Sequence, residues 1–157
     1  MDPLTRLVHL LALATYFGTT LSLALVFLPA TTVIEDPAVQ RTALARGLRP
    51  YNVLSVGALG VLIMTGASGL TDLKARYGAD FQQLLWPLAT KLALTFALTM
   101  VGTYISFGIA HRLVRAELGM LAIEPEKQRG MVRRMQGAAW LALALAVWTA
   151  WIGLGMR

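Results

Sequence analysis

Three polar side chains within apolar stretches are the candidates for chemistry in this sequence: His9, Tyr16 and Lys91. The imidazole of His9 can bind a metal ion or transfer a proton, and the phenol of Tyr16 can donate a hydrogen bond. The ammonium group of Lys91 is costly inside an apolar stretch, where charged side chains rarely face lipid. We therefore assign these three residues to cofactor binding, with His9 as the metal ligand, and assign no catalytic residue.

The residues around His9 predict a helix that crosses a membrane. Positions 7–29 contain no Asp, Glu, Lys or Arg, and a bilayer core of about 30 Å needs roughly 20 apolar residues in a helix. This run is longer than the apolar core of a signal peptide, about 7–15 residues, so we expect a permanent first span. Within it, polar or small residues recur at steps of three and four: His9, Ala12, Tyr16 and Thr19. That spacing places them on one helix face, which we expect to look into a bundle.

The composition of the whole chain indicates an integral membrane protein. Of its residues 57% are hydrophobic and 14% are charged, whereas soluble domains carry about 25% charged residues. We predict an all-α fold, an integral membrane up-down four-helix bundle that forms a single domain over residues 1–157. The predicted spans are 5–33, 51–70, 84–111 and 137–156.

The third predicted span carries a second polar stripe. It starts at Lys91 and continues at three- and four-residue steps through Thr95, Thr99, Gly102 and Ser106. We expect this stripe to face the other helices. The connection before the second span is expected to hold a short helix at about 38–46 and to end at Arg49-Pro50.

The distribution of basic residues predicts the orientation of the spans. The connections between spans one and two and between spans three and four hold Arg41, Arg46, Arg49, Arg112, Arg115, Lys127, Arg129, Arg133 and Arg134. The opposite side has only Arg6, Lys74, Arg76 and Arg157. Because basic residues favour cytoplasmic loops, we expect both termini outside, in the periplasm if this is a bacterial inner-membrane protein. The net charge of +6 then reflects topology, and no nucleic-acid partner is expected.

Several kinds of cofactor site are excluded by the residues present. The chain has no cysteine, which excludes disulfides, thiolate metal sites, iron–sulfur clusters and covalent c-type haem. His9 and His111 fall at opposite ends of spans that run in the same direction, about 30 Å apart by helix rise, so they cannot share one haem. The predicted spans hold no Asp or Glu, which argues against a carboxylate proton relay.

Short motifs along the first three spans resemble the membrane domain of copper-resistance D (CopD-like) proteins. They are His9, Tyr16-Phe17-Gly18, Leu28-Pro29, Met64-Thr65-Gly66 and Ala89-Thr90-Lys91-Leu92. The resemblance implies an inner-membrane protein that takes part in copper uptake or delivery. It also implies a periplasmic copper-binding protein or other membrane subunits as partners. This chain is far shorter than most of that family and lacks a soluble copper-binding domain.

A weaker similarity connects the chain with membrane protoporphyrinogen oxidases of the HemJ type. Those enzymes share a first-span histidine followed by an aromatic residue and a glycine, and a third-span lysine. The similarity implies haem b as cofactor and makes His9 and Lys91 the residues associated with haem or substrate. The Leu-Pro-Arg motif expected after the glycine is missing, since Pro29 is followed by Ala30.

Three functions remain open on the sequence alone. The first is copper handling with His9 as a ligand, and the second is a haem-dependent oxidase. The third is a structural or assembly subunit of a membrane complex, without catalysis. Whether the protein is an enzyme is left undecided, with a non-enzyme favoured. Membrane lipid and a homo- or hetero-oligomer are the expected surroundings.

Overall fold

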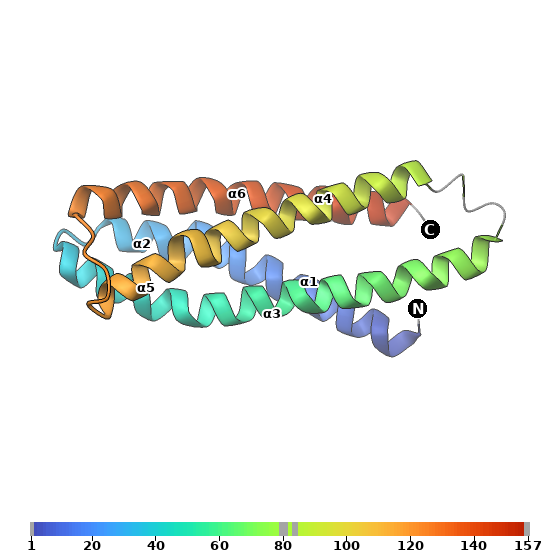
Figure 1. Ribbon diagram of the computed structural model, residues 1–157, viewed down its shortest axis with the longest axis horizontal. Helices are drawn as coiled ribbons and strands as arrows, with labels where there is room; N and C mark the ends of the chain where they lie inside the picture. The colour runs from blue at the N-terminus through green and yellow to red at the C-terminus, as the bar shows by residue number, and fades with distance from the viewer. Residues whose placement is uncertain (1, 79–81, 83–84, 156–157) are drawn as a thin grey trace.

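The protein is a bundle of four helical rods that run up and down (Figure 1). The computed structural model describes residues 2–78, 82 and 85–155. The rods are α1 (Pro3–Ser22) with η1 (Leu23–Phe27) and α2 (Leu28–Thr32); α3 (Pro37–Tyr77); α4 (Leu85–Thr103) with η3 (Tyr104–Ala110) and α5 (His111–Glu117); and α6 (Pro125–Gly155). The segments η1 and η3 are π-helical insertions within otherwise α-helical rods. The predicted all-α four-helix architecture is confirmed.

Four helices are long and apolar enough to cross a membrane: Pro3–Thr32, Pro37–Ala75, Leu85–Glu117 and Pro125–Gly153. Each overlaps one of the predicted spans; only 51–70 lies wholly within its helix, 5–33 extends one residue beyond Thr32, and the predicted limits at 84 and 156 lie outside the described residues. The chain is therefore a multi-pass membrane protein by the length and composition of its helices. The first helix begins and the last helix ends at the same end of the bundle (Figure 1).

Acidic caps followed by proline start the first two rods. The Asp2 carboxylate accepts hydrogen bonds from the Thr5 amide at 2.8 Å and the Thr5 hydroxyl at 2.6 Å. These bonds hold the pKa of Asp2 below its usual value, because they stabilise the charged form. Asp36 accepts from the Ala38 amide at 2.8 Å in the same way. In both cases the proline that follows has no amide hydrogen to leave unpaired in the first turn.

The prediction that the helix breaks at Arg49-Pro50 is wrong. Helix α3 continues through Pro50 and is 41 residues long. A proline inside a helix loses a backbone hydrogen bond and costs about 3 kcal/mol. On either side of it, Leu48 and Tyr51 are buried against the neighbouring helices. This apolar face continues without interruption through the proline, and its packing outweighs the local cost.

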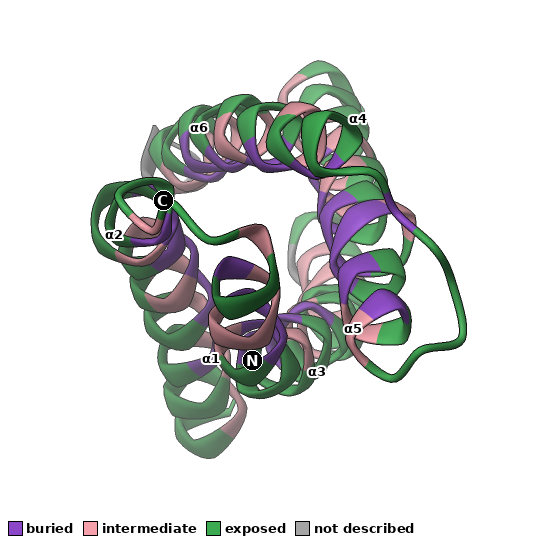
Figure 2. Cartoon of the chain, turned by 90° about the vertical axis from the view of Figure 1, so that its left-hand side faces the viewer, coloured by how far each residue is buried: buried purple, intermediate pink, exposed green. Residues whose placement is uncertain are grey.

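Buried residues lie at one end of the bundle only. None of the residues 3–11, 60–75, 85–97 and 147–153 is buried; we call this third of the bundle the open end. The rest, the closed end, contains the core, and Figure 2 shows its buried residues on stretches of all four rods. Throughout the bundle α1 packs mainly on α3, and α4 packs mainly on α6.

A buried network of amide groups fastens the closed end. Gln128 at the start of α6 donates to the Gln40 side chain at 2.8 Å and accepts from the Arg41 guanidinium at 3.0 Å. Gln40 in turn donates to the Thr31 carbonyl at 2.8 Å. The network joins α2, α3 and α6. Gln40 and Gln128 are both buried and hydrogen-bonded, as polar groups in an apolar core must be.

A glycine pair in α3 tests this packing. A Cβ on Gly47 would overlap the ring of Phe27, whereas a Cβ on Gly57 would meet nothing within 4 Å. We expect Gly47→Ala to lower the free energy of unfolding by about 1–3 kcal/mol, because the ring must move. Gly57→Ala should leave it unchanged or raise it by up to about 1 kcal/mol through helix propensity. Unfolding in mixed detergent micelles measures both, and equal effects would contradict the packing.

Candidate functional site

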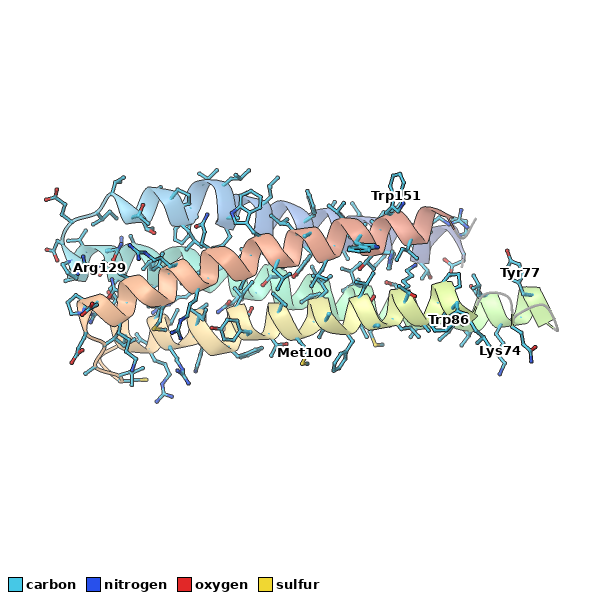
Figure 3. All side chains as sticks on the ribbon, turned by 90° about the horizontal axis from the view of Figure 1, so that it is seen from above. Lys74, Tyr77, Trp86, Met100, Arg129 and Trp151 are labelled. Atoms are coloured by element: carbon cyan, nitrogen blue, oxygen red, sulfur yellow. The ribbon has the colours of Figure 1, made fainter. Side chains whose placement is uncertain are left out.

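The open end brings together one residue from each rod. His9 on α1, Lys91 on α4 and Gly153 on α6 are all half-buried there, as is Thr65 on α3. Trp86 and Trp151 lie at this end and Arg129 lies at the opposite end (Figure 3). The candidate residues therefore lie at the end of the bundle that carries Trp86 and Trp151, opposite Arg129.

A hydrogen bond to Thr65 fixes the His9 ring. The His9 Nδ1 lies 2.7 Å from the Thr65 Oγ1. The Thr65 hydroxyl itself donates to the Val61 carbonyl at 2.6 Å. A hydroxyl has one proton; when that proton is directed to the Val61 carbonyl, the Thr65 oxygen accepts at His9, and on this basis we assign the hydrogen to Nδ1. This assignment follows from the hydrogen-bond network, and it leaves Nε2 of His9 with a free lone pair.

Lys91 points from α4 toward α6. Its Nζ would lie 3.2 Å from a Cβ built on Gly153, so the ammonium group rests against the backbone of α6. Any larger residue at position 153 would displace it. Lys91 is also close enough to His9 for its charge to act on the imidazole. The site therefore combines an imidazole and a cation at one end of the bundle.

The stripe predicted to continue from Lys91 does face the other helices. Thr95 and Thr99 are half-buried, and Gly102 and Ser106 are buried. The two threonine hydroxyls donate to the carbonyls of Lys91 and Thr95, each at 2.8 Å. The predicted face of the first span is directed inward as well, since Ala12 and Tyr16 are buried and His9 and Thr19 half-buried.

Tyr16 does not join His9 and Lys91. Its side chain is fully buried, at 0% exposure. It follows His9 by seven residues, which is about 10 Å of helix rise. Its nearest polar neighbours are Thr20 and Tyr51. The structure thus unites two of the three predicted cofactor-binding residues and places the third deeper in the core.

Few metal donors accompany His9. No group of three or more His, Cys, Asp or Glu residues that could hold a metal ion occurs within 2–78, 82 and 85–155. Met64 and Met100 are exposed, and Met135 is fully buried in the core. His111 is exposed at the start of α5, at the closed end.

A wide groove on the bundle contains none of the predicted site residues. It has a volume of about 800 Å³ and lies between α1 and α6. Its walls are apolar and include Phe17, Leu21, Trp140, Trp148 and Trp151. The groove offers surface to lipid or another apolar molecule, but no group that could direct chemistry.

Fold and site together define a multi-pass membrane protein with four helices long enough to span the bilayer and a polar site at one end. No family model, curated protein or solved structure matches the chain. The resemblances to CopD-like and HemJ-type proteins therefore stay predictions.

Two residues of the site could not have been assigned from sequence reasoning. Thr65 was visible as part of a Thr-Gly motif, but nothing in the sequence pairs it with His9. Gly153 was not singled out, because the register of α6 against α4 is set by packing. A small residue opposite a lysine is recognisable only once that register is known.

The tautomer of His9 is directly measurable. The chain has two histidines, so His111→Gln leaves His9 as the only one, and ¹⁵N-labelled histidine reports on it alone. At about pH 8, above the ordinary imidazole pKa of about 6.5, we expect the Nδ1–H form to predominate. Thr65→Val should shift the ring to a mixture or to mainly the Nε2–H form, while Thr65→Ser should preserve Nδ1–H. An Nε2–H ring in the otherwise native protein would refute the assignment.

Proposed function

We propose that this membrane protein binds an anionic tetrapyrrole of the haem b class at its open end. The observation that carries the proposal is that His9, held by Thr65, and Lys91, resting on Gly153, lie at the same end of the bundle. Imidazole is a common ligand of haem iron, and an ammonium group pairs with carboxylate side chains such as the propionates. The similarity to HemJ-type oxidases supports the same assignment from the sequence.

The residues present fit such a ligand. His9 would hold the haem iron through its imidazole, and the hydrogen bond to Thr65 would keep Nε2 available for it. Lys91 can hold a carboxylate at the same depth. Haem b, when bound, would supply electron transfer or oxidation chemistry. The open end has no buried residue at 3–11, 60–75, 85–97 or 147–153, so no packed core has to be displaced. Whether the protein is an oxidase of protoporphyrinogen remains a prediction from resemblance.

The charge of Lys91 favours an anion over a metal cation. A positive charge next to His9 repels Cu(I), whereas it attracts a carboxylate. Copper also requires further imidazole or thioether donors, and the described residues include no group of three or more His, Cys, Asp or Glu that could hold a metal ion. Copper handling, as implied by the CopD-like resemblance, therefore remains a prediction that needs donors from a second protomer or a periplasmic partner.

Titration of the detergent-purified protein with haem b tests the proposal. Wild type should bind haem and show the absorption bands of a histidine-ligated species, and His9→Ala should lose them. Lys91→Met should weaken binding about tenfold, equivalent to roughly 1.4 kcal/mol, because the carboxylate loses its partner. Lys74→Met is the matched control, since Lys74 is exposed near the end of α3, and it should bind as wild type does.

Elemental analysis of the same samples separates the alternatives. Bound copper that disappears in His9→Ala, without any haem spectrum, would overturn the tetrapyrrole proposal in favour of copper handling. If the samples contain neither haem nor copper, the tetrapyrrole proposal fails as well, and a role as a structural or assembly subunit is the function to pursue.

We infer that the open end and both termini face outside, in the periplasm of a bacterial inner membrane. The nine basic residues of the two connections lie on α3, α5 and α6 toward the closed end, where Figure 3 shows Arg129. Basic residues are retained on the cytoplasmic side. This charge asymmetry supports the orientation.

Single cysteines test the orientation, because the chain has none of its own. Thr71→Cys near the end of α3 and Glu126→Cys at the start of α6 are both exposed. In intact cells with a permeable outer membrane, an impermeant maleimide should label Thr71→Cys at least tenfold more than Glu126→Cys. Lysis should make both reactive. The reverse pattern in intact cells would mean that the closed end faces outside.

A further inference from the structure

Four buried polar atoms in the middle of the bundle make no hydrogen bond to any described residue. They are the hydroxyl oxygens of Tyr16, Thr20 and Tyr51 and the side-chain oxygen of Asn52. Tyr16 and Thr20 are 0% exposed and Tyr51 is 7% exposed. The Thr20 hydroxyl lies near both tyrosine hydroxyls without meeting either in ordinary hydrogen-bond geometry.

Thr20 differs from other threonines of the membrane helices. Thr19 donates to the Thr15 carbonyl at 2.8 Å, and Thr149 donates to the Leu145 carbonyl at 2.7 Å. Such bonds to the preceding turn are how hydroxyls are satisfied within a span. The Thr20 hydroxyl is instead available to a partner from outside the helix.

Leaving these atoms unpaired would be expensive. An unsatisfied buried donor or acceptor costs roughly 1–3 kcal/mol, and the bilayer core offers no bulk water to compensate. Water is a ligand that both donates and accepts, and an internal water typically makes about three hydrogen bonds. The hydroxyls of Tyr16, Thr20 and Tyr51 provide that number of partners in one place.

A groove on the surface of the bundle reaches one member of this group, Asn52. Its volume is about 230 Å³, and it is lined by Asn52, Val53, Val56, Ser106, Phe107 and His111. One water occupies about 30 Å³ of liquid, so the groove can hold several. Asn52 lines the groove and also carries one of the four unpaired oxygens. The groove therefore extends from the exposed His111 to Asn52, the residue that follows Tyr51 in the chain.

The helix beside the groove is locally altered. Ser106 and Phe107 belong to the π-helical segment η3, and Thr20 comes shortly before the π-helical segment η1. Such insertions widen a helix turn and are frequent at functional sites. On the other side, a Cβ on Gly102 would lie 3.4 Å from the Tyr16 hydroxyl, so α4 closes over that end of the group.

We propose that water enters the bundle from the closed end through this groove and binds between Tyr16, Thr20 and Tyr51. The inlet, as we name this path from His111 to Tyr16, is a dead end within the membrane core. It brings water, and protons carried by water, to within about two helix turns of His9. The inlet does not depend on which ligand the open end binds.

Infrared spectroscopy of a single buried thiol tests the inlet. Because the chain has no cysteine, Thr20→Cys introduces one S–H group at the proposed water site. Its control is Ala24→Cys, which places a thiol one turn further along the same rod at another fully buried position. In protein reconstituted in lipid bilayers and transferred to D₂O, we expect the S–H band of Thr20→Cys to exchange at least tenfold faster.

A second pair of cysteine variants tests the groove itself. It provides an independent result if Thr20→Cys does not fold. Ser106→Cys lies in the groove, and Thr103→Cys lies about one turn away on an exposed position of α4 that faces lipid in the bilayer. A charged methanethiosulfonate reagent reacts with the thiolate, which forms in water. It should modify Ser106→Cys at least tenfold faster than Thr103→Cys. Equal rates within both pairs, whether fast or slow, would overturn the inlet.

Discussion

The hydrogen-bonded closed end is the constraint on which the rest of this bundle depends. In lipid, helices gain little from burying apolar surface against each other, so packing and interhelical hydrogen bonds hold them together. Here the buried side chains of Gln128 and Gln40 connect three rods by hydrogen bonds. Because the rods are fastened there, the other end can remain unpacked without the bundle separating.

The open end then acts as a place for polar side chains that a packed core could not accept. His9 is supported from α3 by Thr65, and Lys91 is accommodated on α6 by the absence of a side chain at Gly153. Each helix pair contributes one chemical group and its support: α1 with α3, and α4 with α6. A ligand bound between His9 and Lys91 would therefore contact both pairs and stabilise their relative position.

The features of this structure that can be predicted from the sequence are those determined within a single helix. Length and apolarity gave the four rods, and three- and four-residue spacing gave the inward faces of His9 and Lys91. The pairing of His9 with Thr65 and the fit of Lys91 on Gly153 depend on the register between two helices, which no local pattern encodes. The wrong prediction of a break at Pro50 also arises from contacts between helices. The packing of Leu48 and Tyr51 against neighbouring helices outweighs the local preference of proline for ending the helix.

The two polar regions of the bundle are kept apart by apolar residues. Leu59 and Leu98 are buried in the same cluster as Tyr16, and each is the last buried residue on its helix before the open end. A methyl group of Leu59 fills the space beside Gly102, at 2.7 Å from a Cβ built there. Water that reaches Tyr16 from the closed end therefore meets an apolar layer before His9. On the inlet proposal, the same leucines that complete the core therefore separate the water site from His9.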